Sequence, residues 1–289
     1  MELTSPKVIK NLLEKYGARL FKGWGQNFLI DEHILKKIVG SANLKKSDIV
    51  LEIGPGIGTL TQELAKRVKP APYRTRSGTG KVIAVEKDKR MCEILSEMLK
   101  SWDIRNVRII QGEILEFNPK SYKLKAKSYK IVANLPFYIV APVIRKFLES
   151  KNPPKEMILM VQKEVAQRIC AKPPDMSILA VSVQFYAKPE ILFYVSKSSF
   201  WPPPKVNGAI LKIIPNRARR NVLRKLFFKV VRAGFSQPRK QLANNLSKEL
   251  KLDKSEVKNW LLENKIEPSR RAETLSIKDW IKLTKNFQK

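Results

Sequence analysis

The residues best suited to chemistry are Asn134-Leu135-Pro136-Phe137, which directly follow the apolar run 130–133. An exocyclic amine on adenine is a poor nucleophile, because its lone pair is delocalised into the ring. Acceptors that hold its two N–H groups out of the ring plane would localise that lone pair and aim it at an electrophilic methyl group. The Asn134 side-chain oxygen and the Leu135 carbonyl are suitable acceptors, since Pro136 fixes the following backbone and has no N–H to compete.

The aromatic ring of Phe137 completes this motif. Stacking of a base on such a ring contributes roughly 1–3 kcal/mol, which is comparable with the few kcal/mol needed to unstack and flip the base. The four residues together predict methylation of an amine on a nucleic-acid base. Taken alone, they would also suit an ordinary turn after a strand.

A glycine-rich turn provides a second group of candidate residues. Gly54 and Gly56 follow the apolar run 49–53, where glycines let the backbone approach a ligand at the carboxyl ends of parallel strands. Glu86 closes the run 82–85, and its carboxylate could accept hydrogen bonds from both hydroxyls of a ribose. A dinucleotide fingerprint requires a small residue where Thr59 stands, so the turn favours an adenosyl ligand over a nicotinamide cofactor.

These motifs require a sheet that places the ends of their strands at one edge. Short apolar runs alternate with helix-like stretches, at 49–53, 82–85, 107–110, 130–133 and 157–161. This alternation predicts an α/β fold with a doubly wound parallel sheet. Two later runs, 191–195 and 209–214, are joined by a proline-rich segment and are expected to form an antiparallel pair at the sheet edge.

The composition changes after Pro215, from strand-like runs to amphipathic helical stretches that continue to Lys289. We therefore predict a catalytic domain at 1–215 and a small all-helical domain at 216–289. The segment from Lys69 to Gly80, rich in proline, glycine, arginine and serine, is expected to be an exposed basic loop.

The charge of the chain points to a polyanionic partner. A formal net charge of +31 is far above what solubility requires. No apolar run has the length of a membrane span, and no metal site is expected, because the chain has a single histidine and its two cysteines lack ligand spacing. We expect a cytoplasmic monomer with reduced thiols and no membrane contact.

Several blocks in order resemble the ribosomal RNA adenine dimethyltransferases, whose bacterial type is the kasugamycin-resistance enzyme. The blocks are Gly25 to Asp31, Glu52 to Gly58, Asn134 to Phe137, Leu159 to Val165, Ser198 to Val206, Phe235 to Lys240 and Arg271 to Glu273. The resemblance implies a Rossmann-like class I methyltransferase fold with S-adenosyl-L-methionine as the cofactor. It also implies dimethylation at N6 of two adjacent adenosines near the 3' end of small-subunit (16S) rRNA, in the immature small ribosomal subunit.

The same resemblance assigns cofactor contacts residue by residue. It gives them to Asn27, Leu29, Gly54, Gly56, Glu86, Glu113 and Asn134. Glu113 stands where the family usually has an aspartate, so we expect a shifted geometry or an intervening water there. Phe137 stands where tyrosine is common and keeps the stacking face.

Basic residues near the proline-rich segment and in the helical region are the candidates for contact with the RNA backbone. They are Lys205, Arg217, Arg219, Arg220, Arg239 and Lys240. Three other functions stay open at this stage: a large-subunit adenine methyltransferase of the macrolide-resistance type, a non-catalytic RNA-binding protein of ribosome assembly, and, more remotely, a nicotinamide oxidoreductase.

Overall fold

The computed structural model describes residues 3–18, 26–68, 80–216 and 224–287, and it divides the chain into two compact units. Unit 1 comprises Met1–Ala166 and Glu190–Pro215, and unit 2 comprises Gln167–Pro189 and Asn216–Lys289. The later border between the two units follows Pro215. Unit 2 also contains Gln167–Pro189, which the sequence analysis placed in the first domain. Apart from Gly80, the expected basic loop lies outside the described residues.

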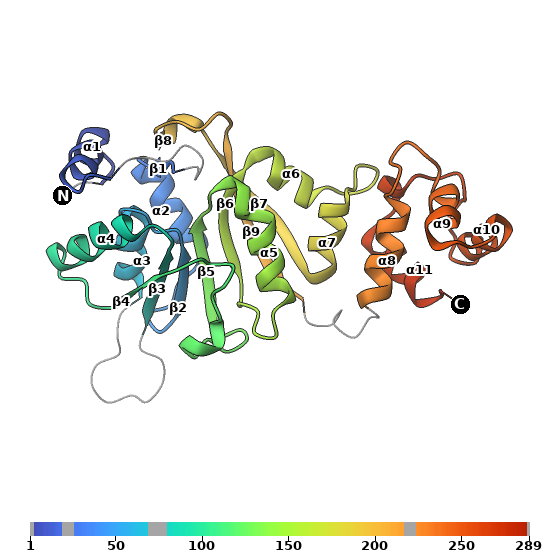
Figure 1. The fold of residues 1–289 in the computed structure, drawn as a ribbon, viewed down its shortest axis with the longest axis horizontal. Helices are drawn as coiled ribbons and strands as arrows, with labels where there is room; N and C mark the ends of the chain where they lie inside the picture. The colour runs from blue at the N-terminus through green and yellow to red at the C-terminus, as the bar shows by residue number, and fades with distance from the viewer. Residues whose placement is uncertain (1–2, 19–25, 69–79, 217–223, 288–289) are drawn as a thin grey trace. The chain divides into compact units, whose positions relative to one another are not determined.

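A sheet of seven strands in the order β4-β3-β2-β5-β6-β9-β7 forms the centre of the fold (Figure 1). The strands are β2 (Ile49–Ile53), β3 (Lys81–Glu86), β4 (Val107–Gln111), β5 (Tyr129–Asn134), β6 (Met157–Gln162), β7 (Ala187–Val195) and β9 (Gly208–Pro215). Strands β2 to β6 pair in parallel, and β9 runs antiparallel to β6. The predicted α/β fold with an antiparallel edge is therefore confirmed.

Helices cover both faces of the sheet, as the direction of the crossovers requires. The connections through α3 (Thr59–Arg67) and α4 (Lys89–Ser101) run from β2 toward β4, whereas the connection through α5 (Val140–Glu149) runs the opposite way, from β5 to β6. Because parallel crossovers are right-handed, α5 lies on the face opposite to α3 and α4. The α3 face also carries α2 (Glu32–Ser41), whose buried side chains share one apolar core with α3.

A second, two-stranded sheet joins the amino-terminal region to the proline-rich segment. Its strands, β1 (Phe28–Leu29) and β8 (Phe200–Trp201), pair antiparallel, with Leu29 opposite Phe200. Asp31 caps the start of α2 by accepting from the Ile34 N–H at 3.0 Å, and it also accepts from the Ser199 hydroxyl at 3.0 Å. This pairing of distant segments was not predicted. Among the described residues, unit 1 also contains α1 (Pro6–Lys15), η2 (Pro119–Tyr122), η3 (Phe137–Ile139) and η4 (Lys197–Ser199).

Unit 2 is helical, apart from the first residues of β7. Besides the end of α6 (Lys163–Cys170), it contains α7 (Ile178–Tyr186), α8 (Arg224–Gly234), α9 (Leu242–Leu250), α10 (Lys254–Glu263), η6 (Ala272–Thr274) and α11 (Ile277–Lys285). Phe185 of α7 stacks on Phe227 of α8 with ring centroids 4.1 Å apart, so the earlier segment belongs to the core of this unit. The Asn245 side chain donates to the carbonyls of Gly234 and Gln237 and thereby fixes the turn between α8 and α9.

Among the described residues, no helix has the length and apolar character needed to cross a membrane. Within the same part of the chain, no group of three or more histidine, cysteine, aspartate or glutamate side chains is arranged to hold a metal ion.

Candidate active site

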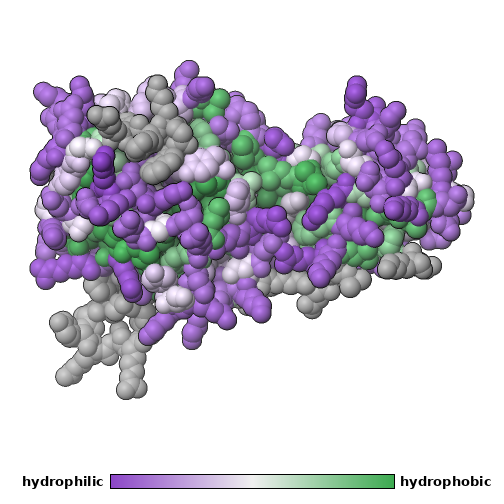
Figure 2. All heavy atoms as spheres, in the orientation of Figure 1, coloured by the Kyte–Doolittle hydropathy of each residue, from purple (hydrophilic) through white to green (hydrophobic). Residues whose placement is uncertain are grey.

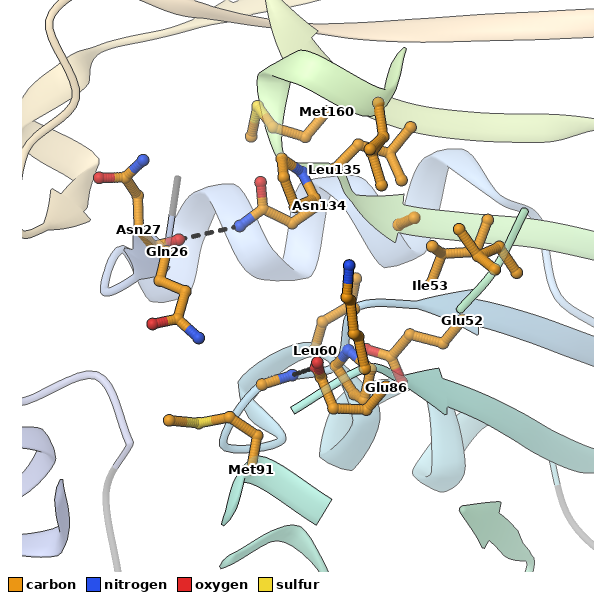
Figure 3. Close-up of a pocket in the computed structure, with 18 of the residues that line it drawn as sticks. Gln26, Asn27, Glu52, Ile53, Leu60, Glu86, Met91, Asn134, Leu135 and Met160 are labelled. Atoms are coloured by element: carbon orange, nitrogen blue, oxygen red, sulfur yellow. Dashed lines mark hydrogen bonds between the residues drawn. The ribbon is translucent and has the colours of Figure 1, made fainter. Parts of the chain in front are cut away.

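A pocket opens at the carboxyl ends of β2, β3 and β5 (Figure 3). Strands β2 and β5 are neighbours in the sheet, and the crossovers that follow them run in opposite directions. Such a switch point is where open α/β sheets bind their ligands. The pocket is lined by the glycine turn, by the ends of β3 and β5, by the segment 26–29 and by the loop at Gly112 to Ile114.

The strand register places the polar residues of the pocket on one face of the sheet. Glu52 is paired with Ala84 on β3 and with Val132 on β5. Glu86 lies two positions after Ala84, and Asn134 lies two positions after Val132. Side chains alternate between the faces of a strand, so Glu52, Glu86 and Asn134 all project from the face that α2 and α3 cover. The sequence analysis predicted that these residues lie at one edge of the sheet, and the strand register shows that they also lie on one face of it.

The glycine turn forms a cradle that a side chain would fill. Gly56 has a φ of +56°, and a Cβ there would lie 3.2 Å from the Phe28 ring. Gly54 has a φ of +65° and donates its N–H to the Val85 carbonyl at 2.9 Å. A Cβ on Gly54 would lie 3.9 Å from Cδ of Pro136, so the cofactor turn and the catalytic motif are in close proximity. Both glycines therefore have a conformational reason to be glycine, and Gly56 also has a steric one.

Glu86 is buried at the end of β3 and holds the turn in place. Its Oε2 accepts from the Gly56 N–H at 3.1 Å, and its Oε1 accepts from the Asp88 N–H at 3.0 Å. A carboxylate has about four lone-pair positions, so it could still accept from the two hydroxyls of a ribose. Burial raises the pKa of Glu86, and the backbone hydrogen bonds oppose that rise.

The side chain of Asn134 is oriented by the amino-terminal segment. Its Nδ2 donates to the Asn27 carbonyl at 3.1 Å, across 107 positions of sequence, as the dashed line in Figure 3 shows. With the amide N–H used in this way, the Oδ1 atom remains as the acceptor of the side chain. Leu135, Pro136 and Phe137 line the same pocket, and Tyr138 beside them is 55% exposed.

The segment 26–29 brings two further predicted residues to the pocket. Asn27 lines it and supplies the carbonyl that Asn134 contacts. Leu29 lines it from β1, where its side chain is buried and belongs to the core shared by α2 and α3. The structure thus gives Leu29 a packing role in addition to its place at the pocket.

Glu113 lies at the pocket in an ion pair that was not predicted. Its Oε2 atom is 2.9 Å from Nζ of Lys87, and Lys87 lines the pocket as well. The hydrogen bond to Glu113 and its negative charge raise the pKa of Lys87. One carboxylate oxygen is therefore held toward Lys87, which leaves the other available for a ligand.

The residues predicted to contact RNA are only partly described. Lys205, Arg239 and Lys240 are exposed, and Lys205 directly follows Pro204, which lines the pocket. The predicted contacts Arg217, Arg219 and Arg220 lie outside the described residues.

Comparison with known proteins extends this description. The family described as "Ribosomal RNA adenine dimethylase" matches residues 18–289. The chain belongs to this family. A curated relative from Dehalococcoides mccartyi (strain CBDB1), named "Ribosomal RNA small subunit methyltransferase A", is 43% identical over 276 residues, which cover 95% of this chain and 90% of the relative.

A solved structure agrees with the assignment to this family. A dimethyladenosine transferase from Plasmodium falciparum superposes with a TM-score of 0.71 at 29% identity, over 88% of this chain and 94% of that one. The 23S rRNA methyltransferase ErmE superposes with a TM-score of 0.70 over 90% of this chain and 99% of that one. At 23% identity, the second comparison supports the fold alone.

S-adenosyl-L-methionine is the cofactor of this ribosomal RNA adenine dimethylase. The pocket fits it on structural grounds, because a Cβ at Gly56 would fill the cradle and Glu86 retains lone pairs for a ribose. Glu52, which is 1% exposed and lines the pocket, adds a second carboxyl group beside Glu86.

The sequence analysis gave no role to two sets of residues that the structure emphasises. One is Glu52. Its position inside an apolar strand run could have indicated an unusual environment, because glutamates are rarely buried. The other is an exposed cationic face of α8, formed by Lys225, Lys229 and Arg232. Their spacing of four and three positions could have revealed that face, because such residues lie on one side of a helix.

Proposed function

We propose that this chain transfers methyl groups from S-adenosyl-L-methionine to N6 of adenosines in small-subunit rRNA, giving N6,N6-dimethyladenosine. The observation that carries the proposal is the oriented Asn134 side chain in the pocket that the glycine turn and Glu86 also line. The name of the Dehalococcoides relative, a small-subunit methyltransferase, supports the choice of RNA.

The residues of the chain position the target amine. Asn134 Oδ1 and the Leu135 carbonyl accept its two N–H groups, and this keeps the N6 lone pair from conjugating with the ring. Pro136 fixes the backbone between these acceptors and Phe137. Bound S-adenosyl-L-methionine would supply an electrophilic methyl group, exchanging its S–CH₃ bond for the new N–CH₃ bond, and the amine would lose one proton to solvent.

Phe137 holds the flipped base by stacking. The ring lies within the pocket lining next to Pro136, and it is partly exposed before substrate binds. Stacking on an aromatic ring is tolerant of geometry and worth roughly 1–3 kcal/mol per base. Replacing Phe137 by tyrosine should therefore keep activity, whereas alanine should weaken the productive binding of RNA.

We propose that two adjacent adenosines near the 3' end of 16S rRNA, in an immature small subunit, are the targets. The protein would act in the cytoplasm as a monomer. The net charge of +31 supports an RNA-containing partner, since it favours association with a polyanion.

The cationic face of α8 is a candidate contact for the RNA backbone. Lys225, Lys229 and Arg232 line a groove of unit 2 with Ala233, Glu249 and Leu250, and the three cations are exposed. None of the three forms an ion pair with another described residue, so their charges are available to phosphate groups. Arg239 and Lys240, on the turn that follows α8, extend the exposed positive charge of the unit. Figure 2 shows that hydrophilic residues dominate the visible surface.

Methyl transfer to isolated ribosomal particles tests the function. Labelled S-adenosyl-L-methionine should methylate immature small subunits and not large subunits, and digestion of the RNA should release dimethyladenosine at two neighbouring positions. Labelling of large subunits instead would favour the macrolide-resistance type of activity. A folded protein that binds cofactor and RNA but transfers no methyl group would favour a non-catalytic assembly factor.

Charge reversal on α8 tests the RNA surface separately. The triple variant Lys225→Glu, Lys229→Glu, Arg232→Glu should weaken binding to small-subunit rRNA by at least tenfold and lower its salt dependence. Lys258→Glu, an exposed lysine on α10, is the matched control and should have a much smaller effect. Equal effects per charge in the two variants would exclude a specific role for the α8 face.

A further inference from the structure

Glu52 is a buried carboxyl group without a partner in the cofactor pocket. It lies in β2, is 1% exposed and lines the pocket next to the glycine turn. Neither of its carboxyl oxygens makes a hydrogen bond, and no described cation forms an ion pair with it. Native proteins leave few buried polar groups unsatisfied, so this one requires an explanation.

Glu52 has an acidic neighbour, which opposes its ionisation. Glu86 on β3 is on the same face of the sheet, and Figure 3 shows the two side chains together. Val132 is its neighbour on β5, and α3 contributes the Thr59 and Thr61 hydroxyls, which also have no hydrogen-bond partner. The charge of Glu86 opposes ionisation of Glu52.

The free protein therefore holds Glu52 in its neutral form at pH 7. Burial raises the pKa of Glu52 to about 8, and the charge of Glu86 adds to the rise. The Thr61 hydroxyl lowers the pKa and offsets part of this rise. A carboxyl group in such a site gains a proton because isolated burial of the charged form is costly.

The ligand of this pocket is cationic, since S-adenosyl-L-methionine carries a sulfonium and an ammonium group. A positive charge nearby favours the ionised form of a carboxyl group, most strongly where little water screens the pair. We propose that Glu52 releases its proton to solvent when S-adenosyl-L-methionine binds and then serves as the buried counter-charge of the cofactor. The proposal rests on the proposed function only in the identity of the cofactor.

This role makes cofactor binding depend on pH in a defined direction. Because the bound state has lost a proton that the free state holds, affinity should rise with pH below about pH 8, by up to tenfold per pH unit. The α-amino group of the ligand titrates in a similar range. The ligand contributes equally in every variant, so the difference between variants isolates Glu52.

Calorimetry in buffers of different ionisation enthalpy measures the proton directly. At pH 7 the wild-type protein should release more protons on binding S-adenosyl-L-methionine than Glu52→Gln, with a difference approaching one. Glu32→Gln, an exposed residue of α2 that pairs with Lys36, is the matched control and should behave as wild type. A thermal unfolding curve verifies that Glu52→Gln is folded.

Equal proton release by wild type and a folded Glu52→Gln variant would overturn the proposal. So would an affinity difference between them that stays constant from about pH 6.5 to about pH 8.5, a range that spans the raised pKa. Both measurements use cofactor alone, without RNA. A failure of the small-subunit function would instead appear as missing methyl transfer with the proton release intact, so the two failures are distinguishable.

Discussion

The Asn134 side-chain amide donates to the Asn27 backbone carbonyl at 3.1 Å, and this bond joins the catalytic motif to the amino-terminal segment. It fixes the orientation of the Asn134 amide in the pocket. One N–H of the amide is used within the protein, and under the proposed function the oxygen accepts from the target amine. A residue that contacts the cofactor pocket thereby also orients the group proposed to bind the target base.

Replacing Asn134 by alanine should abolish methyl transfer with little effect on RNA affinity. The variant loses the acceptor for the amine, and loss of one such positioned group typically costs about 10²–10³-fold in kcat. Single-turnover transfer and RNA binding should be measured side by side. A large loss of RNA affinity would mean that the motif anchors the RNA and does not act in the chemical step.

Gly56→Ala should weaken cofactor binding, whereas Gly40→Ala should not. Gly56 has a φ of +56°, and a Cβ there would lie 3.2 Å from the Phe28 ring at the pocket. Gly40 lies in α2, and a Cβ there would have no neighbouring atom within 4 Å, so alanine should stabilise the helix by about 0.5–1 kcal/mol. Calorimetric titration with S-adenosyl-L-homocysteine and thermal unfolding of both variants check this pair.

The ion pair between Lys87 and Glu113 should tune cofactor affinity modestly. The two side chains are 53% and 28% exposed, so their interaction is screened by water and weak. Lys87→Met should weaken binding of S-adenosyl-L-homocysteine by about two- to fivefold at low salt. In a Glu113→Gln background the same change should have no further effect. Independent effects of the two substitutions would exclude coupling through this pair.

Glu52→Gln should stabilise the free protein near neutral pH. The folded-state pKa of Glu52 is about 8, above the ordinary value of 4.5, so the folded state binds more protons than the unfolded state between these values. Its contribution therefore lowers the free energy of unfolding as pH rises from about 4.5 to 8. Urea unfolding at about pH 5 and about pH 8 should show a larger advantage for the variant at the higher pH. A constant difference would mean that Glu52 is ionised in the fold.

Much of the fold could be predicted from local sequence. The apolar runs predicted β2 with its observed bounds and the other parallel strands to within a few residues, because buried parallel strands are continuously apolar. The same reasoning missed β1 and β8, since strands of two residues leave no periodic pattern. It also missed that Gln167–Pro189 belongs to the helical unit, which follows from side-chain packing such as that of Phe185 on Phe227.

The sequence by itself determined the order of the motifs, their position at the ends of strands and the family, because these depend on residue type and on neighbours along the chain. Only the tertiary structure decided how the motifs act on one another. The bond from Asn134 to Asn27, the pairing of Glu113 with Lys87 and the isolation of Glu52 beside Glu86 join residues from different elements. Burial and charge at such contacts depend on which strands are neighbours and in what register, and no local pattern of residues encodes that.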